Sequence, residues 1–123
     1  VERAMVRSEV HFGALRRAVQ PAIDSVLRNP NALAWTVFSR KRSVETYNRA
    51  IGTTVWCLMF GRQLGFERER LEDLAMGGML LDIGMSRIPR SIAATAGDLS
   101  EEQHNSLRQH VAFGVEILEC SKG

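Results

Sequence analysis

Apolar residues recur at intervals of three and four along this chain, and this spacing decides what it can fold into. Such stripes run over residues 44–58, 71–82 and 107–118. An interval of three and four places the apolar residues on one face of an α-helix. No stretch alternates apolar and polar residues for long enough to predict a strand. The sequence therefore predicts an all-α protein.

Start and stop signals divide the stripes into separate helices. Asn29 and Pro30 match a helix cap followed by proline in the first turn, and Ser100 with Gln103 matches a capping box. Gly65 matches a left-handed helix stop. Helices are expected near residues 3–19, 21–28, 30–40, 43–64, 67–81 and 101–119. Their connections are short, so the sequence predicts a compact multi-helix bundle.

The length of 123 residues suits one domain. We expect one helical domain over residues 1–123, with residues 1–20 as a leading or linker helix. The first residue is valine, so the sequence also fits a piece of a longer chain.

Composition and charge exclude some partners and locations. The net charge of +2 is too small to indicate nucleic-acid binding. The longest apolar run, residues 55–60, is too short to span a bilayer, and the first ten residues lack the apolar segment of a signal peptide. We therefore expect a cytoplasmic protein without membrane insertion. Cys57 and Cys120 lack metal-type spacing, and Cys57 is expected in the core.

Asp82 and His110 extend two of the apolar stripes. A buried carboxylate without a partner is costly. A histidine on an apolar face is more often a satisfied core residue than a ligand, and an aspartate at a helix end is often a cap. On two helices that pack together, however, the two residues predict a shared polar centre.

Four segments resemble a known family in the same order and with similar spacing. They are "SVLRNPNALAW", "ETYNRAIGTTV", "FGRQLGF" followed by "LEDLAMGGMLLDIGMSRIP", and "LSEEQHNSLRQHVAFGVEIL". The family is the HD-GYP branch of the HD-domain metal-dependent phosphohydrolases, which are bacterial signalling proteins that hydrolyse cyclic di-GMP. The resemblance covers roughly residues 22–123 and implies a helical bundle of the HD-domain type. The family's second half, with its Gly-Tyr-Pro loop, has no counterpart in this sequence.

The resemblance places five functional positions of the family on this chain. The aspartate is kept as Asp82 and the later histidine as His110, whereas the other three positions carry Arg49, Leu81 and Met85. Leucine has no lone pair, arginine repels a dication, and methionine lacks the charge of the family's lysine. The family type uses a di- or trinuclear iron or manganese centre. Here we expect no metal, no other cofactor and no catalytic residue.

Function is therefore expected to differ from that of the family type. We expect a catalytically inactive HD-GYP-like domain, not an enzyme, that acts as a binding or regulatory module in bacterial signalling of the cyclic di-GMP type. Its partner would be another protein or a second copy in a homodimer. The alternative is a cyclic di-GMP phosphodiesterase, or another metal-dependent phosphohydrolase, whose reduced metal site is completed by segments absent from this sequence.

A cyclic dinucleotide is a further candidate ligand, because arginines near the former metal site suit a phosphate. The candidates are Arg42, Arg49, Arg87 and Arg90. For Arg87 and Arg90 we favour ordinary surface solvation.

The resemblance also makes one geometric prediction. In the family, the residues at positions 49 and 82 approach the same metal, so their side chains should still converge here. We expect the Arg49 guanidinium to pair with the Asp82 carboxylate, with His110 nearby. In the competing arrangement, Arg49 extends into solvent and Asp82 caps the turn at Gly84.

Overall fold

The computed structural model describes residues 10–31 and 45–121. Every regular element within these ranges is helical, so the predicted all-α class is confirmed. The elements follow along the chain as α1 (Phe12–Arg28), α3 (Glu45–Gln63), α4 (Arg68–Leu80), the 3₁₀ helix η1 (Ile83–Arg87), α5 (Arg90–Ala93), α6 (Glu101–Arg108) and α7 (His110–Cys120).

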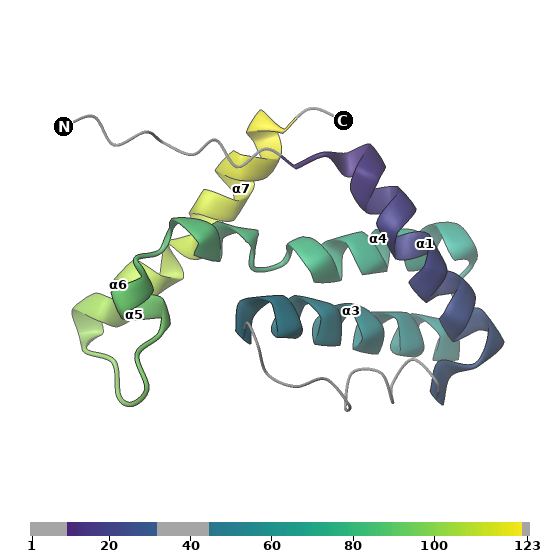
Figure 1. Cartoon of the computed structure of the whole chain (residues 1–123), viewed down its shortest axis with the longest axis horizontal. Coiled ribbons are helices and arrows are strands. Elements are labelled where there is room, and N and C mark those ends of the chain that lie inside the picture. The colour runs from purple at the N-terminus through teal and green to yellow at the C-terminus, as the bar shows by residue number, and fades with distance from the viewer. Residues whose placement is uncertain (1–9, 32–44, 122–123) are drawn as a thin grey trace.

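Helices α1, α3 and α4 enclose the core, with α3 and α4 running antiparallel and α1 packed across them (Figure 1). One cluster of buried side chains joins the three helices: Val19, Ile23, Val26, Leu58, Leu71 and Ala75. Burial of an aliphatic side chain of this size stabilises the fold by about 1.5–3 kcal/mol. Two ion pairs also join α1 to α4 at the edge of this core. Arg68 pairs with Asp24, and Arg16 pairs with Glu72 at 3.1 Å. The apolar stripes of the sequence thus build the scaffold on which the site stands.

The turn between α3 and α4 follows the predicted left-handed stop. Gly65 has a φ of +76°, a conformation that favours glycine. Its N–H donates to the Arg62 carbonyl at 3.0 Å, and the Phe66 N–H donates to the Gly61 carbonyl at 2.9 Å. Phe66 then packs against the core cluster. The tight turn fixes the antiparallel pairing of the two helices.

Two predicted helix boundaries are wrong. The expected break between residues 19 and 21 is absent, because α1 continues through Pro21. Pro21 is exposed, whereas Val19 and Ile23 on either side of it are buried, and a continuous helix keeps both on the core face. The chain over residues 101–119 is two helices, because the Gln109 N–H bonds the Ser106 carbonyl at 3.2 Å in a tightened turn.

Other predicted ranges fall partly outside the described residues. The helix expected at 30–40 lies outside them from residue 32 onward. The leading helix expected over residues 1–20 is described only from residue 10, and it belongs to α1 from Phe12 onward. The start of the helix expected at 43–64 lies outside the described residues, and its end agrees with α3 to within one residue. The helix expected at 67–81 agrees with α4 to within one residue at each end.

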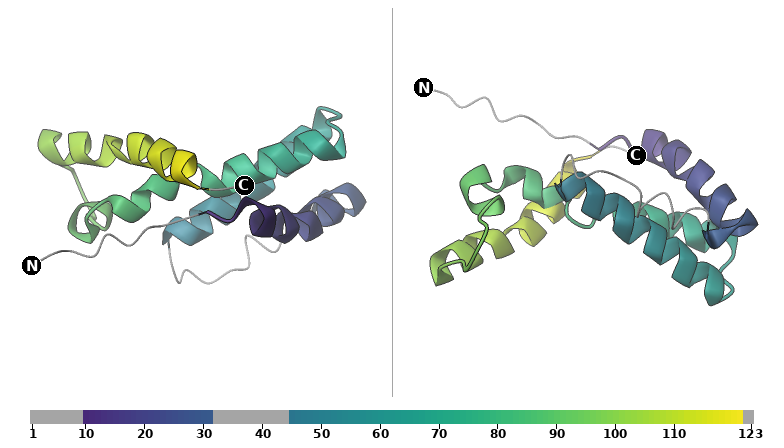
Figure 2. Two further views of the ribbon diagram at one scale, coloured as in Figure 1. Left: turned by 90° about the horizontal axis from the view of Figure 1, so that it is seen from above. Right: turned by 60° about the horizontal axis from the view of Figure 1, so that its bottom comes forward.

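The second part of the chain reaches beyond this core. Helices α5 and α6 and the start of α7 extend to one side of the three-helix group (Figure 2). Helix α7 contacts η1 so closely that a Cβ added at Gly84 would lie 1.8 Å from the His110 carbonyl oxygen. At the other end of α7, the Val10 N–H donates to the Ser121 hydroxyl at 2.8 Å. These two contacts position α7 relative to the end of α4.

Candidate functional site

Asp82 stands where α4 gives way to η1. Its backbone carbonyl accepts the Met85 N–H at 2.9 Å, which holds the start of the 3₁₀ turn. The side chain makes no capping hydrogen bond, so the competing arrangement, in which Asp82 caps the turn, is not observed. Its side chain is 14% exposed. The carboxylate is therefore free of the local backbone and directed to other partners.

The partner is Arg49, near the start of α3. Arg49 Nη2 donates a hydrogen bond to Asp82 Oδ2, with 2.7 Å between the two atoms, which confirms the predicted ion pair. The contact uses one nitrogen, and the Arg49 side chain is 65% exposed. Water therefore screens the pair, and an exposed pair contributes only about 0–1 kcal/mol. The pair is therefore neither deeply buried nor bidentate.

His110 approaches Asp82 from the first turn of α7. Its Nδ1 lies 2.6 Å from the Leu107 carbonyl oxygen, and since a carbonyl only accepts, Nδ1 is the donor. Nε2 then faces Asp82 Oδ1 at 3.8 Å, which is too long for a hydrogen bond. The predicted polar centre thus exists, with Asp82 between Arg49 and His110.

A pocket of about 300 Å³ opens beside this centre. Arg49, Asp82 and Met85 line one side of it, and residues 93–96 line the other. Residues 93–96 are three alanines and a threonine, and they lie between the helices predicted at 67–81 and 101–119. Their small side chains were the available signal, because small residues let a ligand approach the backbone closely.

Leu81 does not belong to this pocket. It is 65% exposed and lines a separate groove between α3 and α4. The positions inferred from the resemblance are therefore divided. Arg49, Asp82 and Met85 share the pocket, His110 contacts Asp82, and Leu81 faces elsewhere.

The other candidate phosphate contacts have different surroundings. Arg87 Nη1 donates to Glu116 Oε2 at 2.6 Å, and its guanidinium lies 5.9 Å from the centre of the Phe113 ring. Arg90 is exposed and is not among the residues that line the pocket. Arg42 lies outside the described residues. Of the three arginines that the structure describes, Arg49 is the one that lines the pocket.

The donors at this centre do not by themselves fit a resident metal ion. Within residues 10–31 and 45–121, no group of three or more His, Cys, Asp and Glu side chains is placed to hold an ion. Asp82 Oδ1 and His110 Nε2 converge, but a metal site in a protein uses three or four protein ligands. The Arg49 cation on the other carboxylate oxygen also opposes a second positive charge. The prediction that no metal binds stays a prediction.

Comparison with known proteins assigns the chain to a family. The family model described as "HD domain" matches residues 26–122, which is most of the sequence. The chain belongs to the HD-domain family. The expected HD-type helical fold is thereby confirmed, and the helix order above is the form that this HD domain takes.

Three curated relatives are similar to this HD domain. A cyclic di-GMP phosphodiesterase of Pseudomonas aeruginosa is 29% identical over 76% of this chain and 23% of its own length. The cyclic di-GMP phosphodiesterase response regulator RpfG of Xanthomonas campestris is 31% identical over 52% of this chain and 17% of its own length. A 3'3'-cGAMP-specific phosphodiesterase of Vibrio cholerae is 29% identical over 70% and 17%. The chain thus spans about a fifth of the length of the curated relatives it matches.

The relatives overturn one expectation. From the residues at positions 49, 81 and 85 we expected that the chain is not an enzyme, but all three relatives are named phosphodiesterases. Replaced ligands in one part of a domain are not evidence that activity is lost, and nothing in the described residues shows such a loss. No solved structure shows significant similarity to the chain. In the described part of the chain, no helix is long and apolar enough to cross a membrane.

Proposed function

We propose that this HD domain recognises a cyclic dinucleotide and acts as a binding or regulatory module in bacterial signalling. The observation that carries the proposal is the Arg49–Asp82 pair at the wall of the pocket. Asp82 Oδ2 accepts a hydrogen bond from Arg49 Nη2, with 2.7 Å between the two atoms, and this bond orients the guanidinium plane. The remaining N–H donors are free for a phosphodiester, which guanidinium groups bind well.

The shape of the pocket supports a phosphate rather than a whole nucleotide. Its volume of about 300 Å³ is at the lower limit for ligand sites. We propose that one phosphodiester of the ring enters beside Arg49, against the small side chains of residues 93–96, while the bases remain outside. The names of the relatives support this ligand class, because two of them include cyclic di-GMP and the third 3'3'-cGAMP.

A second candidate function is hydrolysis of the same ligand. The names of the three relatives favour it. In this case the phosphodiester would lie near Asp82 Oδ1 and His110 Nε2, which are 3.8 Å apart. Two donors are too few for a hydrolytic centre of the family type, so further groups would come from residues outside the described part.

Calorimetric titration with cyclic di-GMP and with 3'3'-cGAMP tests the first proposal. Arg49→Ala should weaken binding about tenfold or more, because it removes a charge-assisted contact to phosphate. Arg62→Ala is the matched control, since Arg62 lies on the same helix about 20 Å away and should change nothing. Absence of binding by the unchanged chain at millimolar ligand would contradict the proposal. Release of a linear dinucleotide in the same samples would favour the second candidate.

A further inference from the structure

A second hollow lies between α3 and α4 and shares no lining residue with the Arg49 pocket. Its volume is about 390 Å³. Thr53 and Cys57 of α3 form one wall, and Leu74 and Gly77 of α4 form the other together with Leu81, which follows α4. Cys57 is only partly buried there, rather than in the core as its apolar run predicted. A Cβ added at Gly77 would meet no atom within 4 Å, so this α4 wall leaves open space.

Exposed apolar side chains continue this groove along both helices. Phe60 is 66% exposed and Leu64 is 54% exposed, and they follow Cys57 at helical intervals of three and four. Leu81, directly after the C-terminal end of α4, is 65% exposed. Large apolar side chains gathered on one face are typical of a surface that binds another protein. We call this surface, formed by the groove together with Phe60, Leu64 and Leu81, the α3/α4 face.

The charges of the α3/α4 face indicate which protein it fits. Arg70 and Asp73, which are three residues apart on α4, also line the groove. The Arg70 guanidinium lies 5.6 Å from the centre of the Phe66 ring, and neither Arg70 nor Asp73 forms an ion pair within the described residues. Opposite charges at this spacing complement themselves when two copies of a helix meet antiparallel. A two-fold axis between them brings each arginine to the aspartate of the other copy.

We propose that two copies of this chain associate through the α3/α4 face about a two-fold axis, with Arg70 of each copy paired to Asp73 of the other. The apolar stripes of both copies are buried between these two ion pairs. A stable interface buries about 800 Å² on each partner, with apolar side chains at its centre. In the proposed dimer, the exposed side chains of Phe60, Leu64 and Leu81 are buried in this interface.

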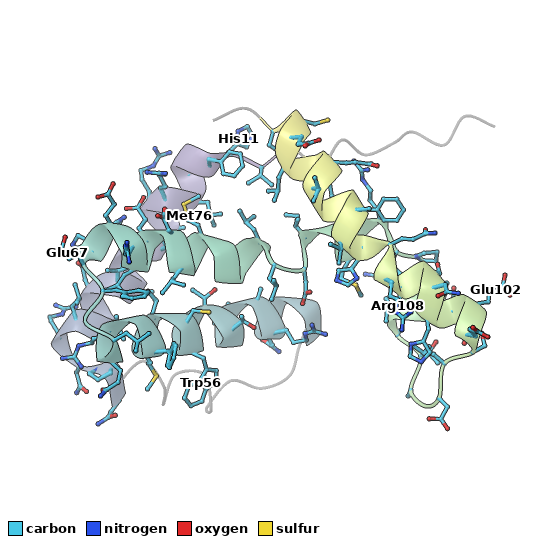
Figure 3. All side chains as sticks on the ribbon, turned by 180° about the vertical axis from the view of Figure 1, so that it is seen from behind. His11, Trp56, Glu67, Met76, Glu102 and Arg108 are labelled. Atoms are coloured by element: carbon cyan, nitrogen blue, oxygen red, sulfur yellow. The ribbon has the colours of Figure 1, made fainter. Side chains whose placement is uncertain are left out.

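Sedimentation velocity over a range of concentrations tests this arrangement. Arg70→Asp and Asp73→Arg should each raise the dimer dissociation constant about tenfold or more, because each creates two like-charge contacts. An equimolar mixture of the two variants should restore association, since all four charges then meet opposites. The double variant R70D/D73R should dimerise as the unchanged chain does. Arg108→Asp on α6, which lies away from helices α3 and α4 (Figure 3), and Val115→Ser on α7 are the matched controls.

Circular dichroism shows whether each variant is folded. If a charge variant unfolds, Gly77→Leu replaces it, because the added side chain fills open space in the monomer but blocks the groove. This variant should also raise the dissociation constant about tenfold. The proposal is overturned if the unchanged chain remains monomeric at millimolar concentration. It is also overturned if the charge variants dimerise normally, or if mixing them restores nothing.

Discussion

Single residues at the Arg49–Asp82 contact differ strongly in their exposure to water. The carboxylate side chain is 14% exposed, whereas the guanidinium side chain is 65% exposed. Water can solvate the Arg49 guanidinium, but it barely reaches the Asp82 carboxylate. The carboxylate therefore needs this hydrogen bond more than the guanidinium does. His110 does not compensate, because its Nε2 lies 3.8 Å from the other oxygen.

A double-mutant cycle with Arg49→Ala and Asp82→Asn measures this contact. We expect a coupling energy of about 0.2–1 kcal/mol in urea unfolding, since water reaches the pair from the arginine side. Removing one partner of a well-buried pair costs about 3–5 kcal/mol, and the exposure of Arg49 lowers that figure here. A coupling above about 2 kcal/mol would mean that the pair is dry in solution.

Residue identity also explains what sequence reasoning did and did not find at the site. The Arg49–Asp82 pair was predictable, because the resemblance to the family implied that residues at these two positions approach one metal. The resemblance did not predict that Leu81 and Asp82, although adjacent in the chain, line different hollows. Successive residues near the end of a helix are rotated by roughly 100°, so Leu81 and Asp82 face different surroundings. Alignment to a motif gives positions in the chain, not directions of side chains.

At the scale of elements, the crossing of α3 and α4 depends on adjacent glycines with opposite surroundings. Gly78 is buried, and a Cβ added there would lie 2.9 Å from the Thr54 Cα. Gly77 is exposed, and a Cβ added there would meet nothing. The α3 and α4 backbones can therefore approach each other closely at Gly78, whereas the space beside Gly77 can accept a side chain.

Alanine substitutions at these two glycines should act in opposite directions. Gly77→Ala should raise the free energy of unfolding by about 0.5–1 kcal/mol, because alanine favours a helix over glycine. Gly78→Ala should lower it by about 1–3 kcal/mol, because the Thr54 backbone must move. Thermal and urea unfolding of both variants measure this. A shift in the same direction for both would show that α3 and α4 cross differently in solution.

Helix boundaries were predictable where the sequence has a chemical signal. The bounds of α3 and α4 follow from the apolar intervals and from Gly65, whose φ of +76° suits glycine. The break at Gln109 has no glycine or proline to mark it, and it coincides with the hydrogen bond from the Gln109 N–H to the Ser106 carbonyl. Pro21 marks a break that does not occur, because core packing on the opposite face holds α1 together.

On the scale of the whole molecule, the two hollows differ in chemistry and in the residues that line them. The Arg49 pocket has a charged pair and small side chains, which suits a phosphate. The α3/α4 groove has an apolar lining with two charges, which suits another protein surface. Association through α3 and α4 would thus leave the Arg49 pocket open to a ligand.

We propose that the chain as a whole holds no transition metal, and elemental analysis tests this. The chain should be purified without chelators, and its iron and manganese content should stay far below one equivalent, because the described donors are too few. Asp82→Ala protein that is prepared in parallel gives the background iron and manganese content. A full equivalent in the unchanged chain that is lost in the Asp82→Ala chain would contradict this proposal and would reopen a metal-assisted role for His110.

The close packing of Gly84 on α7 has a consequence for anyone who wishes to alter this domain. With no side chain at residue 84, the backbone of η1 rests directly on the His110 carbonyl group. The separation of Asp82 from His110 is therefore set at a residue that has no functional group of its own. A larger residue there would widen the spacing between the two side chains while leaving both chemically unchanged. Spacing and chemical identity at this centre are thus independently adjustable, and each is encoded at a different position of the chain.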